Sequence, residues 1–307
     1  MKAIRVHEYG RPEVLRLEEI ARPEPGADEL LIKVHAASVN PVDWKIRAGH
    51  MKDFMPMIFP YIPGFDISGV VESIGAGVTK FKSGDAVFGR LDGSGAYAEY
   101  ALVKETDLAL KPKSLDHVHA AAIPVAALTA WQALFEAAQL RPGQRILIHG
   151  AAGGVGIFAV QFAKSKGAHV IATASEKNQG FLRELGVDEP IDYSKTRFED
   201  VVRDVDVVLD TMGGETQERS LKVLKKGGIL VSLVQPPSAE HAAKYGVRAV
   251  MLRGHKSAAD LMEIAQLIDS GRVKVFVETI VPLAEARRAH ELSESGHVRG
   301  KIVLKVV

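Results

Sequence analysis

The chain contains no cysteine among its 307 residues. Disulfide bonds, thiolate nucleophiles and zinc sites with cysteine ligands are therefore excluded. The absence is typical of proteins in a reducing compartment, and we expect a cytoplasmic location.

The sequence also has neither a long apolar run nor an excess of one charge. Its most apolar stretch, residues 120–134, contains Pro124, Thr129 and Gln132 and falls short of the ~20 apolar residues of a membrane span. Residues 1–8 lack the apolar core of a signal peptide. Because 39 basic residues face 38 acidic ones and no basic stripe stands out, we expect neither nucleic acid nor a membrane as a partner.

The length and the hydrophobic content of 47% predict a folded chain of about two domains. The first third contains short β-rich segments between glycines and prolines, and this pattern predicts a compact barrel-like β domain. The segments are residues 30–34, 69–74, 85–88 and 98–103.

From about residue 116 the pattern changes. A helical run to about Leu140 is followed by strands that alternate with helices, which predicts a parallel, doubly wound sheet. One predicted helix ends at residues 225–228, where two glycines suit a C-cap. A helix over 258–270 and β segments at 274–281 and 300–306 close the chain. The predicted strands of the sheet are residues 145–149, 169–173, 205–210 and 228–234, and helices are expected at 154–166 and up to residue 185.

The segment His149–Gly156 reads HGAAGGVG and lies directly between an apolar strand and a helix. A diphosphate needs bare backbone N–H groups at the positive end of a helix dipole, and glycine lets the chain approach closely. Gly153 and Gly156 would supply the tight turn and the close helix–strand packing. In this context the glycines predict a dinucleotide site.

The residues after the next strand bear on the choice of nucleotide. An acidic residue at its end would bind the ribose 2′-hydroxyl of NAD, whereas Ser175 stands there and Lys177 follows. A hydroxyl and an ammonium favour the 2′-phosphate of NADP. A shift of one residue would bring Glu176 to that position and reverse the preference, so both nucleotides stay open here.

Several segments in their expected order resemble the medium-chain dehydrogenase/reductase superfamily, in its zinc-free quinone oxidoreductase and enone reductase branch. The resemblance covers nearly the whole chain. It is carried by residues 38–43, 63–75, 84–89, 124–131 and 296–303.

The resemblance implies an α/β fold with a GroES-like β-barrel domain and a Rossmann doubly wound parallel-sheet domain. The expected boundaries are 1–117 for the first, 118–256 for the second and 257–307 for a segment that returns to the first. It implies NADPH between the two domains. The expected cofactor residues are Thr129, Ala152, Gly153, Gly154, Val155, Ser175, Lys177, Tyr193, Leu233, His297, Val298 and Arg299.

The chain departs from the zinc alcohol dehydrogenases of this superfamily. It reads Gly64-Phe65-Asp66 where they have Gly-His-Glu, so we expect no zinc and no metal-assisted alcohol oxidation. The expected acceptor is a quinone or the activated C=C bond of an α,β-unsaturated carbonyl. An amide or a cation would stabilise the enolate that forms when hydride adds to such an acceptor.

The candidates for that role are Asn40, Asp43 and Lys45. Asn40 could instead cap a turn, and Lys45 could be a surface lysine paired with Asp43. A zinc-free reductase of small aldehydes and a non-catalytic NADPH-binding sensor or scaffold are the alternative functions. A homodimer is expected, with the apolar strand near residues 247–252 pairing edge to edge with its copy.

Overall fold

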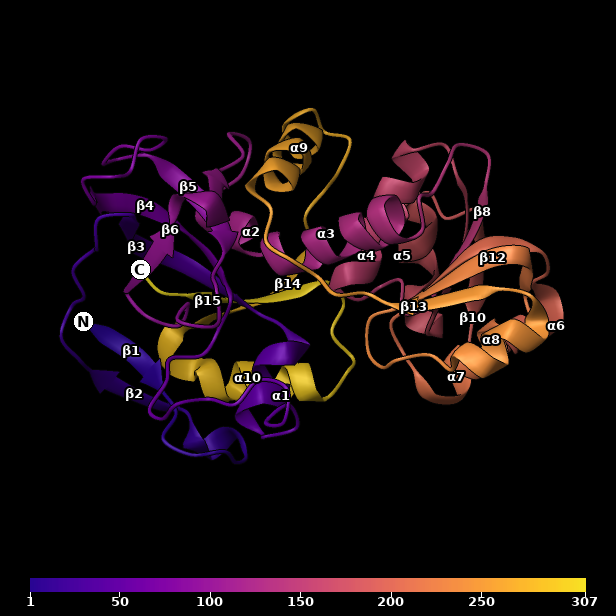
Figure 1. The fold of residues 1–307 in the computed structure, drawn as a ribbon, viewed down its shortest axis with the longest axis horizontal. Coiled ribbons are helices and arrows are strands. Elements are labelled where there is room, and N and C mark those ends of the chain that lie inside the picture. The colour runs from indigo at the N-terminus through magenta and orange to yellow at the C-terminus, as the bar shows by residue number, and fades with distance from the viewer. The chain divides into compact units, whose positions relative to one another are not determined.

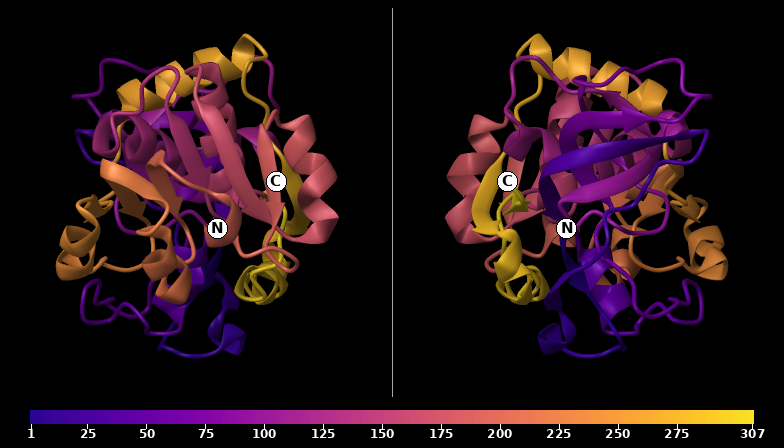
Figure 2. Two further views of the ribbon diagram at one scale, coloured as in Figure 1. Left: turned by 90° about the vertical axis from the view of Figure 1, so that its right-hand side faces the viewer. Right: turned by 90° about the vertical axis from the view of Figure 1, so that its left-hand side faces the viewer.

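The computed structural model describes residues 1–307 and contains two compact units, residues 1–128 with 256–307 and residues 129–255 (Figure 1). The first unit combines both ends of the chain, and the N- and C-termini both belong to it (Figure 2). Residues 118–128, expected at the start of the second domain, fold with the first. The reason is that α2 (His117–Ala121) packs against strands of the first unit.

The first unit is built around a seven-stranded sheet of order β14-β15-β3-β4-β5-β7, in which β6 also pairs with β3. The last strand, β15, runs antiparallel to β3 and places Val303 opposite Ser38, so the C-terminal segment completes the N-terminal sheet. The strands of this sheet are β3 (Glu29–Val39), β4 (Asp66–Ile74), β5 (Ala86–Arg90), β6 (Tyr100–Lys104), β7 (Leu108–Leu110), β14 (Val277–Pro282) and β15 (Lys301–Lys305). A separate antiparallel pair consists of β1 (Lys2–Arg5) and β2 (Arg16–Glu19).

Apolar residues of the long strands form the core of this unit. Ile32 and Val34 of β3 and Ile67 of β4 are fully buried in one cluster. Alternation along a strand sends every second side chain to the same face, so β3 and β4 supply the centre of the core. The helices of the unit are α1 (Pro41–Arg47), α2, α9 (Ala258–Asp269) and α10 (Ala286–Glu294), with single 3₁₀ turns at Pro12–Val14, Glu105–Asp107 and Leu283–Glu285.

The second unit has a six-stranded sheet of order β10-β9-β8-β11-β12-β13 in which every neighbouring pair is parallel. Helices of the same unit flank the sheet (Figure 2). The chain moves outward from β8 in one direction to β9 and in the other to β11, so the strand order reverses at β8. The predicted doubly wound fold is confirmed. The strands are β8 (Arg145–Ile148), β9 (His169–Ala174), β10 (Glu189–Asp192), β11 (Val205–Asp210), β12 (Leu224–Ser232) and β13 (Arg248–Met251).

The observed helices correct two expectations. The run predicted up to Leu140 is divided, because Pro124 begins a new helix, α3 (Pro124–Trp131), which continues as a π-helical segment, Gln132–Ala137. The helix predicted to end at 225–228 ends at Ser220, and Gly227, at φ +77°, lies within β12. The glycine pair therefore makes an irregularity in a strand. The other helices are α4 (Gly154–Ser165), α5 (Gln179–Glu184), α6 (Phe198–Val201), α7 (Gly214–Ser220) and α8 (Ala239–Tyr245), with a 3₁₀ turn at Glu176–Asn178.

Every helix is too short or too polar to cross a lipid bilayer.

Candidate functional site

The glycine turn follows β8, at the point where the strand order reverses. Gly150 has φ +61°, a conformation that favours glycine, and Gly153 is the N-cap of α4. A Cβ on Gly156 would lie 2.4 Å from the Gly150 carbonyl oxygen and 2.6 Å from the Ala151 Cα. Only a glycine at 156 therefore lets α4 approach the turn this closely.

The backbone amides of the turn divide into used and available donors. The Gly153 N–H donates to the Gly150 carbonyl and the Ala151 N–H to the Thr173 carbonyl, both at 3.0 Å. Ile157 donates to Gly153, the N-cap. The amides of residues 154–156 precede that first helical bond and have no acceptor within the helix. With the positive end of the helix dipole they form a cradle suited to a diphosphate.

His149 precedes this turn and is a structural residue. Its Nδ1 lies 3.0 Å from the Thr173 hydroxyl and its Nε2 lies 2.9 Å from the Ser220 hydroxyl, and the side chain is buried. Burial lowers the pKa of His149 to about 4, so the ring stays neutral at physiological pH. It therefore joins β8, β9 and α7 beneath the cradle.

The residues expected around the adenosine ribose lie at the ends of neighbouring strands. Ser175 follows β9, and Tyr193 follows β10 with its N–H on the Ala174 carbonyl at 3.3 Å. The side chains of Lys177 and Tyr193 are exposed, and Ser175 is half-buried. The parallel pairing of β9 and β10 brings Ser175 and Tyr193 to the same edge of the sheet, and Lys177 follows Ser175 in the next turn of the chain.

Glu176 is the acidic residue because of which the sequence left the choice between NAD and NADP open. It has a partner that the sequence did not reveal. Lys195, beyond β10, forms an ion pair with its carboxylate. The pairing raises the pKa of Lys195, chiefly through the hydrogen bond to Glu176. The two residues are 19 positions apart in the sequence, and the pairing of β9 with β10 brings them together.

Asp210, at the end of β11, is a second residue that the sequence analysis missed. It is fully buried, and its Oδ1 accepts hydrogen bonds from the Met212 and Gly213 amides at 3.0 and 2.9 Å. Its Oδ2 accepts from Gln217 and Ser232. The carboxylate thus fixes the loop after β11, next to the glycine turn, and the Leu233 amide donates to its backbone oxygen.

Thr129 and Leu233 complete the expected cofactor residues of the second unit. Thr129 is half-buried on α3, and Leu233 is half-buried directly after β12. The remaining three expected residues belong to the first unit, in the loop between α10 and β15. There His297 and Arg299 are exposed, whereas Val298 packs against the core.

Asn40 is the N-cap of α1, and its side chain also bonds to residues outside that helix. The Nδ2 group donates to Asp66 Oδ2 at 2.8 Å, and Oδ1 accepts from the ammonium of Lys301. Asp66 also accepts from the Ser38 hydroxyl at 2.6 Å and from the Val125 amide at 2.8 Å. The amide plane of Asn40 is therefore fixed from both sides.

Asp43, at the third position of α1, holds the start of that helix together with Asn40. Its Oδ2 accepts from the Asn40 N–H at 2.7 Å and from the Tyr97 hydroxyl at 2.9 Å, and only 2% of the residue is exposed. It does not pair with Lys45, whose ammonium lies 5.7 Å from the centre of the Trp44 ring. We therefore regard Asp43 as a residue that shapes α1, and Lys45 as the one candidate of the three that is half-exposed.

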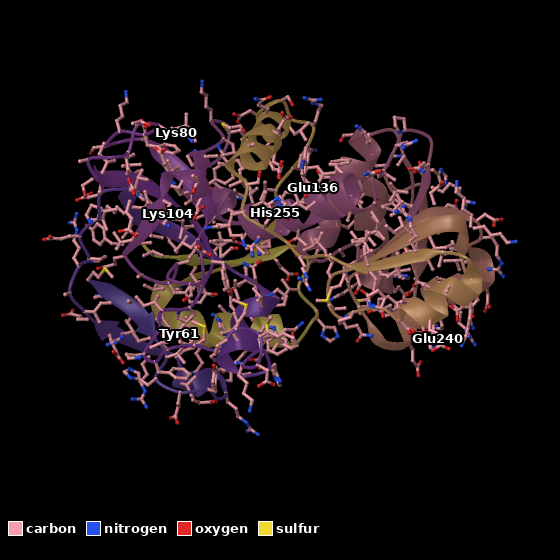
Figure 3. The ribbon with its side chains drawn as sticks, viewed as in Figure 1. Tyr61, Lys80, Lys104, Glu136, Glu240 and His255 are labelled. Atoms are coloured by element: carbon pink, nitrogen blue, oxygen red, sulfur yellow. The ribbon has the colours of Figure 1, made fainter.

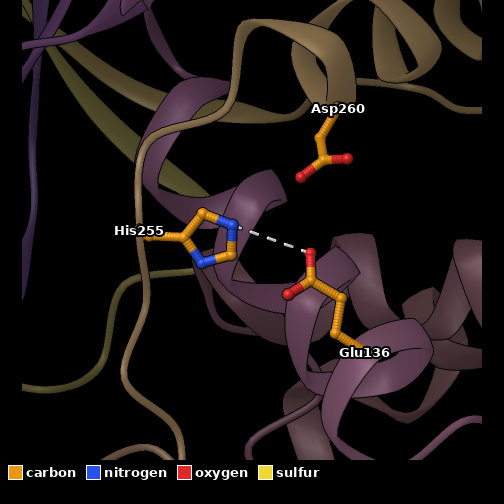
Figure 4. A group of neighbouring side chains, drawn as sticks. All are labelled: Glu136, His255 and Asp260. Atoms are coloured by element: carbon orange, nitrogen blue, oxygen red, sulfur yellow. Dashed lines mark ion pairs between the residues drawn. The ribbon is translucent and has the colours of Figure 1, made fainter.

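One further pair of side chains has the chemistry of metal ligands. Glu136 and His255 of the second unit are 3.8 Å apart, with exposures of 47% and 55% (Figure 3 and Figure 4). Asp260, also drawn in Figure 4, belongs to the first unit. Exposed acidic groups are common without a metal ion, so this pair alone carries no argument for a metal centre.

The glycine turn generates a first prediction. Gly156→Ala should raise the dissociation constant for NADPH about tenfold or more, because the added Cβ pushes α4 away from the turn. The control is Gly180→Ala in α5, where a Cβ meets nothing within 4 Å. Titration followed by nucleotide fluorescence measures both. If the Gly156→Ala variant bound NADPH with the affinity of the wild-type protein, the nucleotide would have to bind elsewhere on the protein.

The buried carboxyl generates a second prediction. Burial raises the pKa of Asp43 to about 7, above the ~3.9 of an unfolded chain. Between these values the folded state holds a proton that the unfolded state has lost, so this group's contribution to stability falls as pH rises from about 4 to 7. Asp43→Asn should remove that dependence, on the order of 1–4 kcal/mol. Urea midpoints between pH 5 and 8 test this, and parallel profiles for the two proteins would contradict it.

Two family models match the chain. The "Alcohol dehydrogenase GroES-like domain" matches residues 26–113, and the "Zinc-binding dehydrogenase" model matches residues 185–304.

Two curated relatives are similar over almost the entire chain. The quinone oxidoreductase of Rattus norvegicus is 34% identical and covers 99% of this chain and 97% of its own length. The 2-methylene-furan-3-one reductase of Solanum lycopersicum is 38% identical, covering 99% of this chain and 79% of its own length. Among solved structures, the Escherichia coli quinone oxidoreductase complexed with NADPH superposes with a TM-score of 0.92 at 29% identity, covering 100% of both chains. The chain belongs to the medium-chain dehydrogenase/reductase superfamily, in its quinone oxidoreductase and enone reductase branch.

Proposed function

We propose that this protein is an NADPH-dependent oxidoreductase that transfers hydride, without zinc, to a quinone or to the activated C=C bond of an α,β-unsaturated carbonyl. The observation that carries the proposal is the turn at residues 150–156, where available amides at the start of α4 surround the place for a diphosphate. The names of the relatives also support it, since they are a quinone oxidoreductase, a 2-methylene-furan-3-one reductase and a quinone oxidoreductase complexed with NADPH.

The preference for NADPH is supported by the residues after β9 and β10. Ser175, Lys177 and Tyr193 offer two hydroxyls and a cation to a 2′-phosphate. Two acids lie nearby, Glu176 and Asp192; Lys195 forms an ion pair with Glu176, and its ammonium also lies 4.0 Å from the Asp192 carboxylate. A carboxylate that pairs with an ammonium repels a phosphate less than a free one does.

Zinc independence is supported by the surroundings of Asp66. Its oxygens already accept hydrogen bonds from Ser38, Asn40 and the Val125 amide, and the Lys301 ammonium lies 3.8 Å away. A buried ammonium disfavours a second cation at the same carboxylate. The donor set therefore does not fit zinc, although one matching family model carries a zinc-binding description.

The bound nucleotide would supply the hydride, and the residues of the chain would orient the acceptor and stabilise its charge. Hydride addition to an enone places negative charge on the carbonyl oxygen. Lys45 is our candidate for a cation or proton donor at that oxygen, and the second N–H of the Asn40 amide is our candidate for a neutral donor. Asn40 suits this role because Asp66 and Lys301 fix its orientation.

A homodimer is part of the proposal. Strand β13 lies at the edge of its sheet, with Val250 and Met251 about 40% exposed (39% and 42%), and a second copy would cover that edge. A single-chain mass in light scattering at micromolar concentration would contradict it. We also propose a cytoplasmic location.

Turnover tests the function directly. Stopped-flow mixing of the NADPH-loaded protein with simple quinones and enones should oxidise the nucleotide, and Lys45→Met should slow that step about tenfold or more. Chelators should leave the rate unchanged. Unchanged turnover in Lys45→Met would remove Lys45 from the mechanism. Binding without turnover across a broad panel that includes small aldehydes would favour a sensor.

The nucleotide preference has its own test. Lys177→Glu should weaken NADPH binding about tenfold and leave NADH binding within a factor of two, because the new carboxylate meets the 2′-phosphate that only NADPH carries. The control is Lys166→Glu, which makes the same charge reversal at the C-terminal end of α4, the end away from the glycine turn. Equal losses for both nucleotides would show that Lys177 does not face that phosphate.

A further inference from the structure

Helix α1 is held at both of its ends by the residues that flank a single loop. The loop, residues 295–300, joins α10 to β15. The residue just before it, Glu294, pairs with Arg47 at the last position of α1. The residue just after it, Lys301, binds Asn40 at the start of α1.

The contact at the start of the helix is buried. The side chain of Lys301 is 5% exposed, and its ammonium donates to the Val39 carbonyl at 3.2 Å and to the side-chain oxygen of Asn40. Asp66, at 3.8 Å, partly compensates its charge. The position of Lys301 therefore depends on acceptors at the start of α1.

The contact at the end of the helix is an ion pair between Arg47 and Glu294. The side chain of Arg47 is 1% exposed and that of Glu294 is 32% exposed. The Nε and Nη1 atoms of Arg47 are buried without a hydrogen-bond partner, so Glu294 is the group that compensates this guanidinium. A buried charge that loses its one partner is costly, which makes this pair a firm constraint.

The two contacts connect groups with different expected tasks. Helix α1 carries Lys45, which we propose to act on the acceptor. The loop carries His297, Val298 and Arg299, which we propose to contact the nucleotide. Both belong to the first unit, and α1 and α10 are in direct contact. Because both residues that flank the loop contact α1, a shift of this helix displaces both ends of the loop.

We propose that Arg47 and Glu294 are positioning residues that couple nucleotide binding at the loop to acceptor binding at α1. This inference rests on the proposed function. When the Arg47–Glu294 contact is weakened, the loop at residues 295–300 and helix α1 can take up positions independently of each other. The affinities for the nucleotide and for the acceptor then fall together. A residue with a purely structural role would lower stability and leave both binding steps unchanged.

The test is Glu294→Gln, which keeps the shape of the side chain and removes its charge. Its matched control is Glu72→Gln, which breaks the exposed Arg22–Glu72 pair of the same unit, joined by one hydrogen bond of 2.9 Å. We expect Glu294→Gln to raise both the NADPH dissociation constant and the acceptor KM at least fivefold. The control should leave both within twofold.

Each other outcome decides the matter. A change in only one of the two constants overturns the coupling, and so do two unchanged constants, whether or not the melting temperature falls. If Glu294→Gln does not fold, Glu294→Asp serves, because it keeps the charge and shortens the reach by one carbon. The same criteria apply to it. Failure of the wild-type protein to bind NADPH would refute the proposed function, and the wild-type titration in the same series reveals that separately.

Discussion

The carboxylate of Asp66 joins segments of the first unit that are far apart in sequence. It is fully buried, and its hydrogen bonds reach β3 through Ser38, the start of α1 through Asn40 and the start of α3 through Val125. Lys301 brings the last strand to the same point. A buried charge requires such a set of donors, so these segments must meet if the unit is to fold. The orientation of Asn40, and with it the geometry we propose for the acceptor, depends on this arrangement.

The sequence predicted those parts of the molecule that local patterns encode. Alternating strands and helices indicated the parallel sheet, and the glycines of 150–156 indicated the turn, because each depends on neighbours in the chain. The Lys-Lys-Gly-Gly segment at 225–228 misled because glycines suit a helix end and a strand irregularity equally well. Pro124 is a residue that often begins a helix, yet the apolar residues around it suggested one continuous helix.

What the sequence could not reveal was long-range pairing. The Glu176–Lys195 ion pair exists because β9 and β10 are neighbours, and the Asn40–Lys301 contact joins residues 261 positions apart. For the same reason Asp43 looked like a partner for Lys45, two residues away. In the structure Tyr97, on a distant segment, reaches Asp43 instead. Side chains two apart on a helix point in different directions, so proximity in sequence misleads there.

The open edge of β13 has a consequence for assembly. Unpaired backbone donors and acceptors along a strand edge can bind any extended peptide. The backbone of the edge therefore cannot discriminate between a second copy of this chain and an unrelated peptide. Discrimination must come from the side chains beside it, of which Val250 and Met251 are partly exposed. In the twofold arrangement that we propose, every substitution in this strand would enter the interface twice, once from each copy. Sequence drift at these few positions would therefore be constrained more tightly than their exposure suggests.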